Sequence, residues 1–169
     1  MLVGLDVPFE TLRAQRRELA PGVRAETLLV TCHAACEVAL LDRLGPTLRL
    51  RTHGRGLEDP SLAHVPHRAV LELGVSRILV FGTSGCPSVA APSSPRQADP
   101  LARMREAAAQ WHARRTATDA RARLDYRAIR SSLSEAGRHD VEVLCVTYAA
   151  ETGLIQRYDE TIDQLACAG

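Results

Sequence analysis

The stretch LELGVSRILVFGTSGC, residues 71–86, decides the fold of this 169-residue chain. Its centre, residues 76–81, ends in four consecutive apolar residues, Ile-Leu-Val-Phe, which is typical of a strand that is buried on both faces. The helical spacing of apolar residues before this strand ends at Gly74, a residue suited to terminating a helix. A glycine-rich turn follows at residues 82–85. A helix, a buried strand and a turn in this order indicate one unit of an α/β fold.

The rest of the chain continues this alternation. Its patterns predict further helices over residues 8–19, 34–44, 61–73, 101–115 and 117–136, and further strands over residues 26–31, 47–51, 141–148 and 154–158. The last two strands are close enough to form a hairpin, and residues 88–100 predict an irregular loop. We therefore expect one domain over residues 1–169, with an N-terminal helical arm at residues 1–24. Its core is a mainly parallel sheet flanked by helices.

Composition excludes several classes of function. Lys and Arg number 21 against 20 Asp and Glu, and the net charge of +1 argues against nucleic-acid binding through bulk positive charge. No lysine is present, which excludes a Schiff-base lysine and a phosphate-loop lysine. No apolar run is long enough for a transmembrane helix, and the N-terminus lacks the basic region of a signal peptide. We expect a cytoplasmic protein.

The five cysteines are the most informative side chains. Their odd number, without an export signal, favours free thiols in a reducing compartment. Cys145 lies in an apolar run and is expected to be buried, whereas Cys32 and Cys86 each follow a predicted core strand. Because ligands of such sheets bind beyond the carboxyl ends of the strands, we expect these two thiols to share one site.

Three kinds of chemistry suit two converging thiols. A catalytic zinc site needs three protein ligands and an open position for water, and the third ligand could be His53, Cys36 or His33. Alternatively, Cys86 in its glycine-rich turn is a nucleophile with His53 as its base. The third reading is a scaffold in which both thiols are simply buried.

These residues also resemble a known family. Cys32 after its strand, the Arg-Thr-His-Gly loop at residues 51–54, and residues 71–86 are similar in order and spacing to β-class carbonic anhydrases. In that family the first strand ends in Cys-x-Asp-x-Arg, the loop reads Arg-Asn-Ala-Gly, and the buried strand leads into Gly-His-x-x-Cys. Residues 141–159, with Glu-Thr-Gly-Leu at 151–154, resemble the family's C-terminal strand and turn.

The resemblance implies zinc held by a Cys, a His and a second Cys, with zinc-bound hydroxide attacking carbon dioxide. Cys32 and Cys86 match the two cysteine ligands. The other positions depart from the pattern, because Thr83 stands at the histidine ligand, Ala34 at the aspartate and Cys36 at the arginine. A neutral hydroxyl is a poor zinc ligand, and alanine cannot orient a hydroxide. Ordinary carbon dioxide hydration is therefore not expected.

We expect instead an altered site around the two retained cysteines. Zinc is the expected cofactor, with Cys32, Cys86 and His53 as its ligands and Cys36 as an alternative third ligand. The candidates for catalysis are His53, Cys36 and Thr83, acting on a small carbonyl or carbon dioxide-like substrate. The alternatives are a non-catalytic pseudoenzyme that serves as a binding or assembly partner, and a metal-free enzyme with a nucleophilic cysteine. The resemblance implies a homodimer or a dimer of dimers; no nucleic acid or membrane partner is expected.

Overall fold

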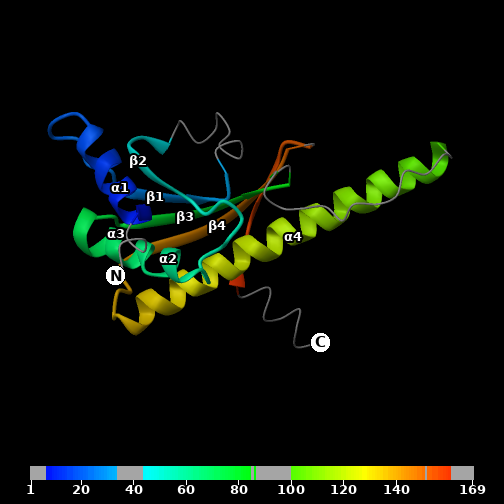
Figure 1. Ribbon diagram of the computed structural model, residues 1–169. Coiled ribbons are helices and arrows are strands. Elements are labelled where there is room, and N and C mark those ends of the chain that lie inside the picture. Colours follow the sequence, from blue (N-terminus) through cyan, green and yellow to red (C-terminus); the bar gives the residue numbers. More distant parts are fainter. Residues whose placement is uncertain (1–6, 34–43, 85, 87–99, 151, 161–169) are drawn as a thin grey trace.

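The computed structural model of the protein describes residues 7–33, 44–84, 86, 100–150 and 152–160, apart from the side chains of three residues in one helix (Figure 1). In chain order the elements are helix α1 (Val7–Glu18), strands β1 (Thr27–Thr31) and β2 (Thr47–Arg51), helices α2 (Pro60–Ala63) and α3 (Val65–Leu73), strand β3 (Arg77–Thr83), helix α4 (Pro100–Glu135), and strands β4 (Glu142–Ala149) and β5 (Leu154–Arg157).

The strands form one five-stranded sheet in the order β2-β1-β3-β4-β5. The first four strands of this order are parallel, and β5 pairs with β4 in the antiparallel direction. The predicted α/β class, with a mainly parallel sheet flanked by helices, is confirmed. The predicted hairpin of the last two strands is also confirmed. Thr31 at the end of β1 lies opposite Phe81 of β3, so the segments that follow these strands leave the sheet at the same edge.

The main core joins one face of the sheet to α1, α3 and α4. Alternate residues of the parallel strands point into it, and Leu28 of β1 and Ile78 of β3 are fully buried there beside Phe9 and Leu12 of α1. A second, smaller cluster on the other face contains Leu29, Leu79 and Phe81. Burial on both faces explains why the central strands are apolar at consecutive positions rather than at alternate ones.

Three helix predictions were wrong in their boundaries. Residues 61–73 form two helices that meet at His64, and Pro66 lies in the first turn of α3, where its missing N–H costs no helical hydrogen bond. Gly74 ends α3 in the left-handed conformation, as predicted. The helices predicted over residues 101–115 and 117–136 are one continuous helix, α4, because the residue between them, Thr116, lowers helix propensity only slightly.

Other predictions fall outside the described residues. These are positions 34–43 of the predicted helix 34–44 and positions 88–99 of the predicted loop 88–100. No helix in the described part of the chain is long and apolar enough to cross a membrane.

Helix α4 lies across the face of the sheet and extends beyond it at its N-terminal end (Figure 1). It approaches β3 most closely at Gly82, where a Cβ atom would lie 3.1 Å from the Thr118 methyl carbon and 3.3 Å from the Ala122 Cβ. A side chain at residue 82 would therefore push the helix away from the strand. This close approach places one face of α4 directly over the carboxyl end of β3.

Two aliphatic residues of α4 offer a matched test of this packing. Ile129 is 2% exposed in the core, whereas Leu124 is 55% exposed. We expect Ile129→Ala to lower the free energy of unfolding by about 2–5 kcal/mol, because it leaves a cavity. The control Leu124→Ala should change it by no more than about 0.5 kcal/mol. Urea unfolding followed by circular dichroism measures both, and equal effects would contradict the described face of the helix.

Candidate functional site

The candidate site lies where β1 and β3 end. Cys32 comes directly after β1, and Cys86 lies three residues after β3. The loop after β2 reaches the same edge, because the Thr52 N–H donates a hydrogen bond of 2.8 Å to the carbonyl of Thr31. The parallel register thus brings three separate segments of the sequence to one edge of the sheet.

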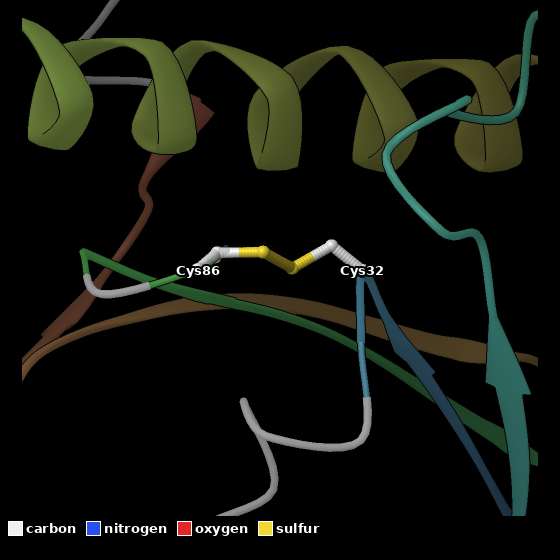
Figure 2. The surroundings of a disulfide bond; sticks show 2 residues. All are labelled: Cys32 and Cys86. Atoms are coloured by element: carbon white, nitrogen blue, oxygen red, sulfur yellow. A yellow bond between two sulfur atoms is a disulfide. The ribbon is translucent and has the colours of Figure 1, made fainter. Parts of the chain in front are cut away.

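The two cysteines are joined by a disulfide bond, with their Cα atoms 7.1 Å apart. Figure 2 shows the bond spanning from the end of β1 to the segment after β3, in the layer between the sheet and α4. The structure therefore brings together the two thiols that the sequence predicted to meet. The expectation of free thiols is wrong for this pair. An odd number of cysteines does not prevent two of them from pairing once the sheet holds them side by side.

The turn that carries Cys86 is fixed by backbone contacts. The Cys86 N–H donates to the Thr83 carbonyl at 3.0 Å, and the Ser84 N–H donates to the Tyr148 carbonyl of β4 at 3.0 Å. The Ser84 hydroxyl in turn accepts a hydrogen bond from the Ala150 N–H at 3.1 Å. Cys86 is only 3% exposed, whereas Cys32 is partly exposed. Cys32 is therefore the more exposed residue of the pair.

The predicted third ligand, His53, is an exposed residue of the loop after β2. Its backbone has a positive φ of 51°, which is uncommon for a residue with a side chain. Its ring lies edge-on to that of His33, with the ring centroids 6.0 Å apart. The two imidazoles therefore share the edge of the sheet where the cysteines meet. The role of His53 as a metal ligand or a base remains a prediction.

The donor set decides whether zinc fits this site. Thr83 is buried at the end of β3 and supplies only a neutral hydroxyl where the resemblance places a histidine. Among the described residues, no three His, Cys, Asp or Glu side chains form a group that could hold a metal ion. Cys36, the alternative third ligand, lies outside those residues. Two thiols without a third donor do not fit a catalytic zinc site, which takes three protein ligands.

A small cavity of about 20 Å³ lies beside Cys32, between the strand ends and α4. Its polar lining comes from Thr31, Cys32, Thr52, Thr118, Arg121 and Asp125. The hydroxyl oxygens of Thr31 and Thr118 are buried and have no hydrogen-bond partner. An unsatisfied buried hydroxyl costs about 1–3 kcal/mol. The two hydroxyls lie on different sides of the sheet, because Thr31 shares the orientation of Leu29 and Thr118 belongs to α4 on the opposite face.

Sequence reasoning missed Asp125. Its carboxyl group is buried on the core-facing side of α4, where Oδ1 accepts a 2.7 Å hydrogen bond from the Leu57 N–H. Burial raises the pKa of Asp125, and the hydrogen bond from Leu57 and the charge of Arg121 oppose this increase in pKa. Arg121 is itself paired with the carboxylate of Glu58. Asp125 lies four positions before the buried Ile129 and therefore on the same face of the helix. This spacing was the signal that could have indicated a buried acid.

Solved structures with a similar fold are β-carbonic anhydrases. The enzyme CafA of Aspergillus fumigatus aligns with a TM-score of 0.61 and 19% identity, over 85% of this chain and 79% of that chain. A Coccomyxa β-carbonic anhydrase solved in complex with acetazolamide aligns with a TM-score of 0.56 and 16% identity, over 86% of this chain and 77% of that chain. One of the tetrameric β-carbonic anhydrases of Sordaria macrospora aligns with a TM-score of 0.51 and 20% identity, over 88% of this chain and 84% of that chain.

No protein-family model matches the chain, and no curated protein matches it in sequence. At identities of 16–20%, the structural likeness shows the fold. The sheet and its helices thus have the architecture that the sequence resemblance implied, and the residues at the carboxyl edge of the sheet must be judged by their own chemistry.

The state of the cysteines can be tested by labelling. In the native oxidised chain at pH 8, we expect no alkylation of Cys32 or Cys86, because both are held in the disulfide. Cys145 should also be inert, because burial raises the pKa of its thiol to about 12. Unfolding without a reductant should expose Cys145 alone among these three, and adding a reductant should expose the pair. Peptide mass spectrometry reads each site, and native labelling of Cys86 would contradict the disulfide.

Proposed function

We propose that this chain, on a β-carbonic-anhydrase-like fold, is not an ordinary carbon dioxide hydratase and that its functional group is the Cys32–Cys86 pair. The pair acts as a couple that alternates between a dithiol and a disulfide. This differs from the metal-free chemistry considered from the sequence, which was a single nucleophilic cysteine. The observation that carries this proposal is the disulfide at the common carboxyl edge of β1 and β3.

The loss of the hydratase groups supports the proposal. In the matching positions Thr83 offers no imidazole and Ala34 offers no carboxylate. Zinc lowers the pKa of bound water only when its ligands hold it in place, and the groups that hydrogen-bond to those ligands strongly affect metal affinity and activity. Without these groups, the two cysteines are the redox-active side chains that the structure describes at the ends of β1 and β3.

The difference in exposure sets the order of the reaction. A small external dithiol attacks the sulfur of Cys32, the more exposed residue of the pair, the disulfide bond breaks, and Cys86 leaves as a thiolate that takes up a proton. The second thiol of the reductant then attacks its own sulfur in the mixed disulfide and releases Cys32. The pair gains two electrons and two protons, and the reductant becomes a disulfide. Because α4 covers the pair, we expect the substrates to be small thiols and disulfides rather than proteins.

A second candidate is a metal-binding site formed by the reduced pair. The Cα separation of 7.1 Å lies slightly above the usual range for disulfides, about 4.4–6.8 Å, and leaves room for both thiolates to bind one ion. The third ligand predicted from the sequence is His53 or Cys36, and His53 would have to move to complete the site, because it forms no group of three ligands with the cysteines as described. Under this reading, as under the sequence prediction, the substrate is a small carbonyl or carbon dioxide-like molecule. Metal analysis separates this candidate from the first.

The first test measures exchange and metal together. Under the proposal, the reduced chain catalyses electron transfer from dithiothreitol to hydroxyethyl disulfide, whereas Cys32→Ser and Cys86→Ser do not. The matched control is Cys145→Ser, which removes a thiol that has no part in the reaction. Reduced chain prepared with added zinc should retain less than about 0.2 zinc per chain after desalting and should not hydrate carbon dioxide. Stoichiometric zinc would favour the second candidate. If the chain neither binds zinc nor catalyses exchange, a non-catalytic binding protein is favoured.

The disulfide also predicts a change in stability. It links residues 54 positions apart, and closing a loop of that length restricts the unfolded chain by about 4 kcal/mol. We expect reduction to lower the free energy of unfolding by about 2–4 kcal/mol in urea titrations. The double variant Cys32→Ser/Cys86→Ser should be insensitive to the reductant. If the wild-type chain is also insensitive, the disulfide is not part of the native protein.

A further inference from the structure

The β2–α2 loop, residues 52–59, lies between the sheet and α4 next to the thiol pair. At its start the Thr52 N–H donates its hydrogen bond of 2.8 Å to the carbonyl of Thr31, the residue directly before Cys32. Thr52 is 2% exposed and lines the same small cavity as Cys32. Figure 2 shows the chain after β2 rising from the sheet to α4 on the Cys32 side of the disulfide. The loop therefore borders the more exposed cysteine of the pair.

Asp125 of α4 fixes the far end of this loop. Its Oδ1 accepts the Leu57 N–H at 2.7 Å, and both residues are buried. The Leu57 side chain belongs to the main core, so the hydrogen bond and the apolar contacts hold the same point of the loop. A buried N–H that loses its acceptor is costly unless it reaches water. Removing the Asp125 carboxyl group would thus favour a loop that moves away from the helix.

Arg121, four residues before Asp125, contacts the same loop at a more exposed point. Its guanidinium group pairs with the Glu58 carboxylate. It also lies against the backbone of Gly56, where a Cβ atom would overlap the guanidinium group. Gly56 has a positive φ of 75°, a conformation that glycine adopts readily. Side chains from two successive turns of α4 therefore contact three consecutive residues of the loop.

His53 lies between the two ends at which the loop is held. The centroid of its ring is 6.0 Å from that of His33, the residue directly after Cys32. The positive φ of His53 is uncommon for a residue with a side chain, and such a conformation persists only where the surrounding structure holds it. The contacts with β1 and α4 supply that support. Release of the loop from α4 would therefore let the residues beside Cys32 move.

We propose that Asp125 and Arg121 are positioning residues that hold the β2–α2 loop against α4, and that this loop determines which thiols reach Cys32. Small dithiols reach the sulfur past the loop, whereas a dithiol carried by a protein is kept away. The inference rests on the proposed thiol–disulfide function and uses the same exchange reaction, with no further reacting group. It assigns the choice of substrate to a loop that the helix holds in place.

The test compares two reductants on the oxidised chain. Dithiothreitol is the small dithiol and reduced thioredoxin is the protein dithiol, and both act by the same exchange. Alkylation and mass spectrometry of Cys32 and Cys86 follow each rate. We expect thioredoxin to reduce the wild-type disulfide slowly compared with dithiothreitol. Asp125→Ala should raise the ratio of the thioredoxin rate to the dithiothreitol rate about tenfold, because losing one buried hydrogen bond shifts the opening of the loop by about that factor.

Matched variants separate positioning from a general effect on the chain. Asp125→Asn keeps an oxygen that accepts the Leu57 N–H, so its ratio should stay close to that of the wild type. Arg121→Ala changes a partly exposed residue and should also raise the ratio. Asp119→Ala, on the same helix but lining a different cavity, should not. Hydrogen exchange of the Leu57 amide reports the loop directly, and it should become faster in Asp125→Ala but not in Asp125→Asn.

Three results would overturn the inference. These are a ratio in Asp125→Ala equal to that of the wild type, an equal increase in Asp125→Asn, and a wild-type disulfide that thioredoxin reduces as fast as dithiothreitol does. Labelling of the buried Cys145 shows whether a variant has lost its fold. If Asp125→Ala does not fold, the ratio in Arg121→Ala decides.

The outcomes keep the two proposals apart. The role of the loop is measured on the reduction of the chain's own disulfide, whereas the proposed function requires catalysed exchange between dithiothreitol and hydroxyethyl disulfide. If exchange is catalysed and the ratio is the same in all variants, the thiol–disulfide function stands and the role of the loop fails. If the wild-type chain catalyses no exchange, the proposed function fails, and if it holds no disulfide, both proposals fail.

Discussion

The parallel pairing of β1 with β3 is the constraint on which the site depends. Two segments about fifty residues apart end at the same edge because neighbouring parallel strands must run in the same direction. Their buried side chains fix the register, since a shift of one residue would turn the apolar positions of each strand to the opposite face. The meeting of Cys32 and Cys86 is therefore a product of core packing, and it does not require any affinity between the two thiols.

Helix α4 contributes the charged side chains of the candidate site. The sheet edge provides sulfur and hydroxyl groups, while α4 adds a carboxyl group and a guanidinium group from the facing side. The absence of a side chain at Gly82 lets the helix come close enough for these groups to line one small cavity. The polar residues around this cavity therefore come from two elements, the edge of the sheet and the helix that covers it.

The sequence predicted the order and type of most elements because the strands at residues 26–31 and 76–81 are strongly apolar and flanked by clear turn residues. It also predicted that Cys32 and Cys86 meet, since parallel strand ends share an edge. It did not predict their disulfide, because bonding depends on a spacing that only the folded backbone fixes. Asp125 was missed because its burial depends on how α4 rotates over β3. The break predicted at Thr116 was wrong because a single β-branched residue lowers helix propensity only slightly, which does not interrupt a long helix.

The 54-residue separation of the bridged cysteines has a consequence for motion. The covalent ring contains β2, α2, α3 and β3, of which β2 is an edge strand and β3 the central strand of the sheet (Figure 1). In the oxidised chain these elements cannot drift apart by more than the ring allows, so their amide hydrogens should exchange with solvent as one cooperative unit. Opening the ring frees β2 to separate from the edge of the sheet independently of the other elements. The cellular redox balance then sets how readily the elements between Cys32 and Cys86 are exposed to proteases.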